Sequence, residues 1–220
     1  MNPERDAEVS LMSTATVTIP TPVNYIEDDW SECSTADGRW NLDPNTREPV
    51  HEGVTTAPDD LERALRHAER TYNVGRWDDD ARRERADLLD RVADFLDARR
   101  EEIARTDSLT TGIPITVTRK IAAVLPERVR AAGRDLIATP RVRPLPAGGR
   151  DVRLYKVPWG PAAILTPWNG PSFISTVKCA NAIAAGCPVV LKPSEHAPAS
   201  VHIVVECFVR AGLPSGALQV

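Results

Sequence analysis

Two short segments of the 220-residue sequence carry the side chains best suited to chemistry. The first is the loop from Thr166 to Gly170, which contains Asn169, and the second begins at Lys192 and ends at Glu195. A lysine ammonium donates up to three hydrogen bonds and a carboxylate accepts several, so the second segment suits the hydroxyl groups of a ribose. The amide of Asn169 next to a helix start suits the stabilisation of a developing oxyanion.

Both segments follow short apolar runs, residues 161–165 and 188–191, that predict strands. Helices are predicted over residues 171–185 and 199–211, each closed by a glycine, and a third strand begins at residue 217. Apolar strands joined by helices pair in parallel through right-handed crossovers. Ligands bind outside the carboxyl ends of such strands. We therefore expect the two polar segments to face one crevice, although they are more than 20 residues apart.

Each of these residues also has a plainer interpretation. Asn169 suits an ordinary helix cap, and Lys192 with Glu195 suits a surface ion pair of little energetic value. Taken singly, the plainer interpretations are the stronger ones, and only the convergence of the two segments favours a nucleotide site. In such a site the charge of Glu195 would repel a 2′-phosphate, which favours NAD over NADP.

The order of motifs between Val157 and Val220 resembles the aldehyde dehydrogenase family. The matching motifs are Pro167-Trp168-Asn169, Lys178, Ala184-Ala185-Gly186-Cys187, Val189 to Glu195 and Ala211-Gly212-Leu213-Pro214. Weaker similarity extends back through residues 43–46 and 85–100. The resemblance implies an α/β fold with a partial Rossmann-like parallel sheet and flanking helices, a helical amino-terminal region and a β-ribbon bridging arm.

The resemblance also implies roles for the two polar segments. It assigns the Asn169 amide to a thiohemiacetal oxyanion, and Lys192 and Glu195, with Ser194 between them, to the adenosine ribose. It places three further residues along the cofactor cleft, namely Thr166, Pro167 and Trp168. The implied cofactor is NAD rather than NADP, and the implied substrate is a small aldehyde.

Three functional parts of the family pattern are expected beyond residue 220: a glycine-rich pyrophosphate loop, a general-base glutamate and a nucleophilic cysteine. No local cysteine is a convincing substitute, because thiols buried in helices are usually inert and covalent catalysis needs an activated nucleophile. The four are Cys33, Cys179, Cys187 and Cys207. We expect the isolated chain to be inactive, with an unpaired sheet edge after Val220. The first interpretation is that the chain is an amino-terminal portion of an enzyme. The two alternatives are a truncated module that binds nucleotide or another subunit, and a degenerate reading frame.

The whole chain divides into four parts by composition and residue pattern. Residues 1–22 predict a flexible tail, 23–138 a mostly helical part of the cofactor-binding domain, 139–158 the arm, and 159–220 the first half of the NAD-binding unit. Within the second part we expect a strand over 23–30, turns at 37–38 and 43–45, and helices over 59–73, 81–105 and 117–137, the last kinked or broken at Pro126. The many arginines of the helix over 81–105 alternate with acids and indicate a solvated face rather than a phosphate site.

The arm combines a turn-rich run, residues 141–150, with alternating polar and apolar residues over 151–157. This pattern predicts an exposed β-ribbon, whose unpaired edges favour a homo-oligomer or association with a full-length subunit. A plain surface hairpin explains the pattern almost as well.

Composition excludes several other classes of function. The net charge of −4 argues against a general nucleic-acid binder, and no apolar run approaches the ~20 residues that span a bilayer. The first residues lack the apolar core of a signal peptide, so we expect a cytoplasmic protein without membrane contacts. The scattered cysteines and histidines predict no metal site.

Overall fold

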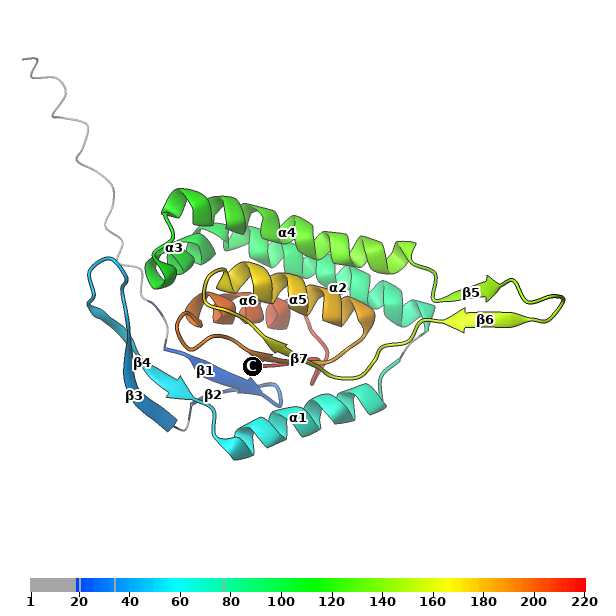
Figure 1. Ribbon diagram of the computed structural model, residues 1–220, viewed down its shortest axis with the longest axis horizontal. Helices are drawn as coiled ribbons and strands as arrows, with labels where there is room; N and C mark the ends of the chain where they lie inside the picture. The colour runs from blue at the N-terminus through cyan, green and yellow to red at the C-terminus, as the bar shows by residue number, and fades with distance from the viewer. Residues whose placement is uncertain (1–18, 20, 34, 77) are drawn as a thin grey trace, which may run out of the picture.

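The computed structural model describes residues 19, 21–33, 35–76 and 78–220 (Figure 1). A three-stranded parallel sheet contains β7 (Ala162–Leu165), β8 (Val189–Lys192) and β9 (Leu218–Gln219), in that order. Two helices, α5 (Pro171–Ala185) and α6 (Ala199–Arg210), connect these strands. The predicted parallel sheet and its crossover helices are thereby confirmed, with strand ends shifted by one or two residues.

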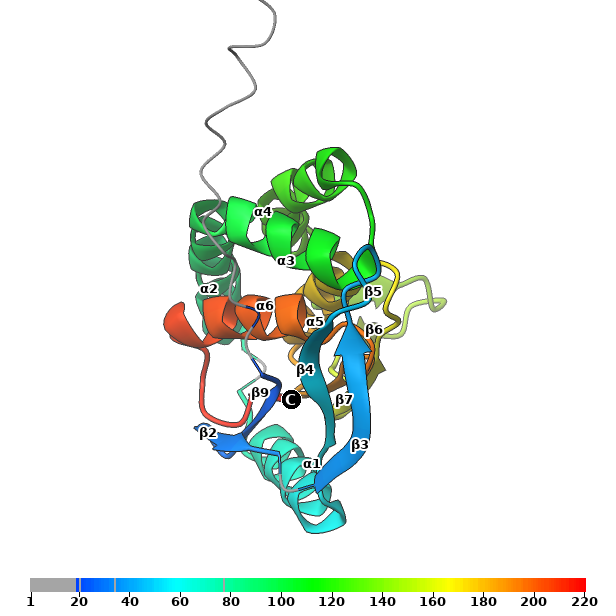
Figure 2. The ribbon, with the colours of Figure 1, turned by 90° about the vertical axis from the view of Figure 1, so that its left-hand side faces the viewer.

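Helices cover both faces of this sheet. α5 and α6 lie on one face, beneath a further layer of α2 (Asp79–Ala98), α3 (Arg100–Thr111) and α4 (Ile115–Ala138), whereas α1 (Pro58–Asn73) lies on the other face (Figures 1 and 2). The α4 helix continues through Pro126 without a break. Apolar side chains between these helices form the core, and its fully buried members include Leu89, Leu96, Ile103, Leu125 and Phe208.

The single helix expected over residues 81–105 is wrong. The structure has two helices that meet at Arg99, which has φ −108° and ψ 13°. The Arg99 guanidinium donates to Glu102, 2.7 Å away, and to Glu206 of α6. No glycine or proline marks the break in sequence, and the observed contacts that hold Arg99 include one to a distant helix.

The strand expected over residues 23–30 is instead a hairpin of β1 (Val23–Ile26) and β2 (Asp29–Glu32). The predicted unpaired edge after Val220 is also wrong. The Tyr25 amide donates to the Val220 carbonyl at 2.9 Å, and the Val220 amide donates back to Tyr25 at 3.0 Å. β1, which forms its own two-stranded sheet with β2, therefore lies against the end of β9 through this residue pair, and the opposite edge, along β7, has no strand partner among the described residues.

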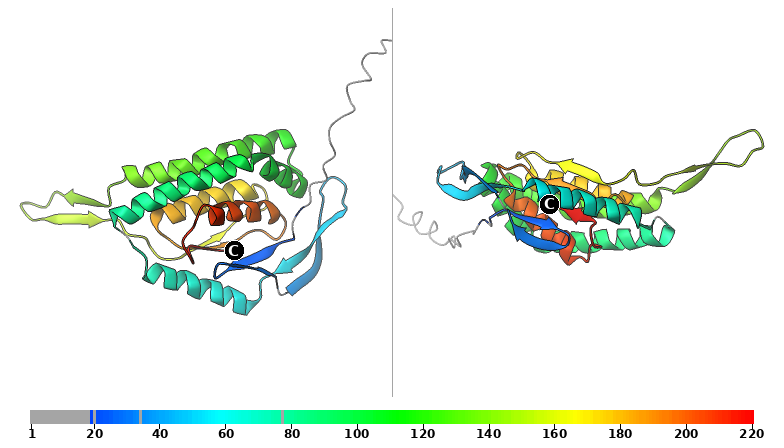
Figure 3. Two further views of the ribbon diagram at one scale, coloured as in Figure 1. Left: turned by 180° about the vertical axis from the view of Figure 1, so that it is seen from behind. Right: turned by 90° about the horizontal axis from the view of Figure 1, so that it is seen from below.

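Two further hairpins flank the helical body. β3 (Thr35–Leu42) pairs with β4 (Pro49–Thr55), where the sequence had indicated only turns. β5 (Val142–Leu145) and β6 (Val152–Tyr155) form the antiparallel ribbon predicted for the arm, which projects from the body (Figure 3). Most of the predicted tail, residues 1–18 and 20, lies outside the described residues.

No helix of the described part of the chain is long and apolar enough to cross a membrane. In the same residues, no group of three or more His, Cys, Asp or Glu side chains is arranged to hold a metal ion.

Candidate functional site

The two polar segments begin side by side at the carboxyl ends of two neighbouring strands. Leu165 of β7 is in register with Lys192 of β8. One residue later, the Thr166 amide donates to the Lys192 carbonyl over 3.2 Å. The loop that contains Asn169 and the turn that contains Glu195 therefore leave the same edge of the sheet, which is the position at which open α/β sheets bind ligands.

The first segment is hydrogen-bonded to α5, but the side-chain amide of Asn169 makes no hydrogen bond within the described residues. Thr166 is buried, and its hydroxyl accepts a hydrogen bond of 3.2 Å from Ser175 of α5. The helix cap is Gly170, whose carbonyl accepts from the Ile174 amide, so Asn169 is not the ordinary cap that was weighed above. Asn169 is exposed, and its side chain has no hydrogen-bond partner among the described residues. Its amide is available to a ligand.

The second segment presents a cation and an anion together. Lys192 Nζ lies 3.3 Å from Glu195 Oε2, and both side chains are well exposed, at 65% and 46%. The pKa of Glu195 is lowered, first by a hydrogen bond from its own backbone amide and then by Lys192. At this exposure the pair adds little to stability, so both charges remain accessible to a polar ligand.

The turn itself is held by buried and distant groups. Ser194 is largely buried, and its hydroxyl accepts from the His196 amide at 3.3 Å, so it shapes the turn. Asn41 of β3 donates to the Glu195 carbonyl at 2.7 Å. Sequence reasoning missed Asn41, because a contact that spans 154 residues leaves no local pattern. Trp168 and Pro167, by contrast, are exposed next to Asn169.

A buried carboxylate supports the start of α5. Asp107 of α3 is 2% exposed and accepts a hydrogen bond from the Ser172 hydroxyl in the first turn of α5. Burial raises the pKa of Asp107, and the hydrogen bond from Ser172 opposes that effect. Asp107 was not singled out from the sequence, because nothing local distinguishes it from the many exposed acids of these helices.

The raised pKa of Asp107 predicts a pH dependence of stability. A carboxyl group with a raised pKa in the folded state stabilises that state while it is protonated. This contribution is fully present below the pKa of Asp107 in the unfolded chain, about 3.9, and is lost as pH rises through its pKa in the folded protein. Relative to the wild type, Asp107→Asn should therefore gain stability as pH rises above about 4, at no more than about 1.4 kcal/mol per pH unit. Chemical unfolding across pH measures this. Asp94→Asn, at a carboxylate with 73% exposure, controls for the loss of one charge, and a pH-independent difference for Asp107→Asn contradicts the prediction.

Burial keeps two of the four cysteines, Cys179 and Cys207, in the thiol form. Burial raises the pKa of Cys179 to about 12 and that of Cys207 to about 11. Burial also raises the pKa of Cys33, and all four cysteines are free thiols. Since the thiolate is the nucleophilic form, Cys179 and Cys207 are packing residues, as predicted for these helix positions.

Comparison with known proteins identifies what this arrangement is similar to. The model of the aldehyde dehydrogenase family matches residues 30–220. A succinate-semialdehyde dehydrogenase from Paenarthrobacter nicotinovorans is 34% identical over 145 residues, which are 66% of this chain and 32% of that protein. A geranial dehydrogenase from Castellaniella defragrans is 31% identical over 81% of this chain and 38% of its own length.

Solved structures of aldehyde dehydrogenases are also similar to this chain. Aldehyde dehydrogenase C from Pseudomonas syringae, in complex with NAD⁺ and octanal, superposes with a TM-score of 0.79 at 34% identity, over 92% of this chain and 40% of that one. A betaine aldehyde dehydrogenase from Staphylococcus aureus, in complex with NAD⁺, gives a TM-score of 0.82 at 25% identity, over 89% and 39%. The chain thus spans about a third to two fifths of the length of the relatives it matches.

Proposed function

Because the chain belongs to the aldehyde dehydrogenase family, we propose that it supplies one wall of the cofactor cleft of an oxidoreductase that converts an aldehyde to a carboxylic acid with NAD. The observation that carries the proposal is the register of Leu165 with Lys192, since it starts both polar segments at one edge of the sheet. The relatives named above include enzymes for succinate semialdehyde and for geranial. We therefore propose an aldehyde substrate of no narrower class.

The residues at this edge fit part of a dinucleotide. Lys192 Nζ and the Glu195 carboxylate offer a donor and an acceptor, both exposed, to the two hydroxyls of a ribose. Thr166, Pro167 and Trp168 follow β7 and would line the cleft, and Ser194 would keep the Glu195 turn in shape. When bound, NAD supplies the acceptor for a hydride from the aldehyde carbon.

Asn169 is the residue of this chain that we assign to the reacting atoms. Its unpartnered amide would donate to the aldehyde oxygen as that oxygen gains negative charge during nucleophilic attack. A donor held in place for a developing oxyanion lowers the barrier more than one that must reorient. Ser175 and Asp107 act indirectly, because they fix Thr166 and Ser172 on either side of the Asn169 loop.

We propose domain boundaries that separate the helical part of the cofactor domain, the arm and the NAD-binding unit. Residues 23–138 would form the mostly helical part of the cofactor domain, 159–220 the first half of the NAD-binding unit, and 139–158 an arm. The ribbon of the arm projects from the body, and all four β6 residues are exposed. We propose that this arm contacts a second copy or a full-length subunit.

A second candidate function is a module that binds nucleotide or a subunit without catalysis. The observation that favours it is the state of the thiols, since Cys179 and Cys207 are buried and protonated at neutral pH. We expect the purified chain to produce no NADH, followed by absorbance, when mixed with an aldehyde and NAD. Turnover by the chain, and above all turnover that survives replacement of all four cysteines, would contradict this expectation and the need for a cysteine nucleophile.

Cofactor choice tests the role of Glu195. We expect the chain to bind NAD weakly and NADP more weakly, because the carboxylate repels the 2′-phosphate. Glu195→Gln should reduce the preference for NAD roughly tenfold, which corresponds to about 1.4 kcal/mol. Titration calorimetry with both cofactors measures the ratio of dissociation constants. Glu62→Gln, an exposed glutamate of α1, is the matched control. An unchanged ratio in Glu195→Gln defeats the assignment.

A further inference from the structure

A cavity of about 290 Å³ lies at the root of the ribbon, where α2, α4 and α5 meet the chain segments that enter β5 and leave β6. It is distinct from the candidate cofactor site, whose residues it does not share. Its apolar walls come from alanines of α4 and α5, from Leu136 and from Val157 and Pro158. Its polar lining includes four basic side chains, Arg82, Arg85, Arg141 and Lys156, and one acid, Asp135.

Two of the arginines are held in the wall of the cavity by carbonyl groups. Arg82 is 9% exposed and donates to the carbonyls of Leu136 and Thr139 at the end of α4. Arg85 Nε donates to the Ala184 carbonyl at 3.2 Å. Carbonyl partners fix the direction of a guanidinium without neutralising its charge. The pKa of Arg85 is lowered, first by burial and then by the nearby charge of Arg82, while Asp78 and Glu84 oppose this shift.

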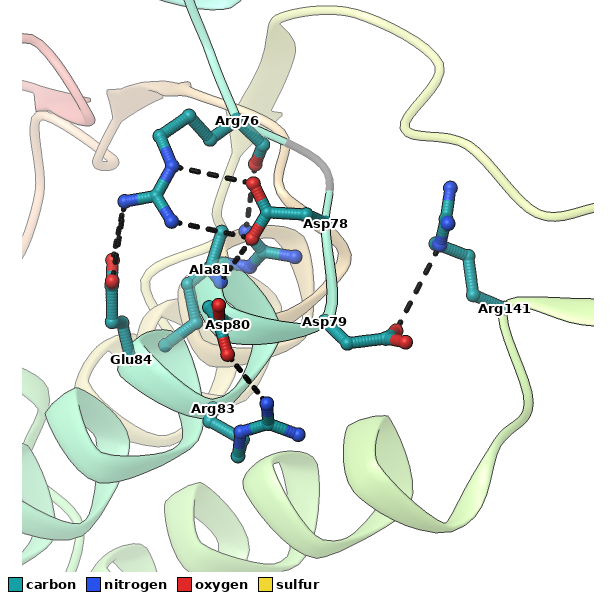
Figure 4. Close-up of polar contacts among 9 residues, drawn as sticks. Arg76, Asp78, Asp79, Asp80, Ala81, Arg83, Glu84 and Arg141 are labelled. Atoms are coloured by element: carbon teal, nitrogen blue, oxygen red, sulfur yellow. Dashed lines mark hydrogen bonds and ion pairs between the residues drawn. The ribbon is translucent and has the colours of Figure 1, made fainter.

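The other two cations come from the ribbon. The Lys156 amide donates to the Arg141 carbonyl at 2.8 Å, which places the two residues opposite each other where the ribbon begins. Arg141 Nε is buried and has no hydrogen-bond partner among the described residues. It forms a long ion pair with Asp79, whose carboxylate lies 3.8 Å away and is 67% exposed (Figure 4).

The surrounding acids compensate this charge only in part. Asp79 is shared, since it also lies 3.7 Å from Arg82. Asp78 and Glu84 are paired with Arg76, and Asp80 is paired with Arg83 (Figure 4). The helix that was expected to present only a solvated arginine face therefore directs Arg82 and Arg85 into a cavity, and that expectation is wrong for these two residues.

We propose that this cavity binds a small organic carboxylate, with the carboxylate group on Arg141 and Lys156 and an apolar tail against the alanine-rich wall. Guanidinium groups bind carboxylates through paired, charge-assisted hydrogen bonds. The Arg141 side chain is 35% exposed, and its ion pair with Asp79 is long at 3.8 Å, so its guanidinium can provide such bonds. Apolar walls with a few polar groups that fix orientation are typical of ligand sites, and the volume lies near the lower end of their range. Such a ligand would also link the ribbon to the helical body, because its carboxylate would contact the ribbon and its apolar tail would contact the helices.

The probe for this proposal is hexanoate, titrated calorimetrically into the purified full chain. Hexanamide tests the need for charge, and inorganic phosphate tests the need for a tail. We expect saturable binding of hexanoate that is at least tenfold tighter than that of either comparison compound. The double variant Arg141→Gln/Lys156→Gln should weaken hexanoate binding at least tenfold. Arg83→Gln, at an exposed arginine of the same helix, should leave it unchanged.

Circular dichroism of each variant establishes that it is folded before its affinity is compared. The proposal is overturned if hexanoate does not saturate, if phosphate binds as tightly as hexanoate, or if the double variant and Arg83→Gln behave alike. Hydrogen exchange of the ribbon amides is a second readout, because hexanoate should slow exchange in residues 142–155 of the wild type but not of the double variant.

Discussion

Replacement of Leu89 by alanine is expected to lower the free energy of unfolding by about 2–5 kcal/mol. Leu89 lies in α2 and is completely buried among the helices that cover the parallel sheet. The substitution removes apolar surface from the core and leaves a cavity that close-packed neighbours fill only in part. Urea unfolding followed by circular dichroism measures the change.

The matched control for this substitution is Leu165→Ala. Leu165 lies on β7, at the open edge of the sheet, and is 71% exposed. Its replacement should change stability by no more than about 0.5 kcal/mol, because exposed side chains lose little on truncation. Equal losses at Leu89 and Leu165 would mean that the helical layer does not form the core described above.

Replacement of Gly216 by alanine is expected to destabilise the chain by about 2–5 kcal/mol, as the sum of backbone strain and overpacking. Gly216 has φ +72°, a conformation that L side chains rarely adopt. An added Cβ would lie 2.0 Å from Thr71 Oγ1 and 2.9 Å from His67 Nε2. Both atoms belong to side chains of α1, so Thr71 and His67 would have to leave their present rotamers or the helix would have to shift.

Gly212→Ala separates the two causes of this loss. Gly212 has φ +85°, and no described atom lies within 4 Å of a Cβ built on it. Its substitution therefore measures backbone strain alone, about 1–2 kcal/mol. Thermal unfolding of both variants gives the difference, and Gly216→Ala should be the less stable. Equal melting temperatures would show that α1 adapts without cost.

The parts of the fold that could be predicted are those with local signals. α5 begins at Pro171 and is followed by Gly186, and both its limits match the prediction. The start of the Asn169 loop beside the segment of Lys192 and Glu195 followed from the rule for parallel strands, which needs only the strand order. The chemical roles of these three residues remain proposals.

The parts that could not be predicted depend on long-range contacts. The interaction of Arg99 with Glu206 spans 107 residues, and that of Asn41 with Glu195 spans 154. The burial of Arg82 follows from carbonyls at the end of α4, 54 and 57 residues away. An alternation of arginines and acids looks the same in a helix face that is exposed to solvent and in one that packs against another helix. Only the assembled structure distinguishes the exposed arginines from the buried ones.

The pairing of β1 beyond β9 has a consequence for how the chain folds. The Glu27 amide donates to the Gln219 side chain across 192 residues, and Tyr25 pairs with Val220 beside it. Closing a flexible loop of this length costs roughly 5 kcal/mol of entropy by polymer scaling. Non-local strand pairing of this kind slows folding, whereas β7, α5 and β8 form a compact local unit. During synthesis β1 therefore leaves the ribosome early, but its bonds to His202, Gln219 and Val220 can form only after those residues have been made.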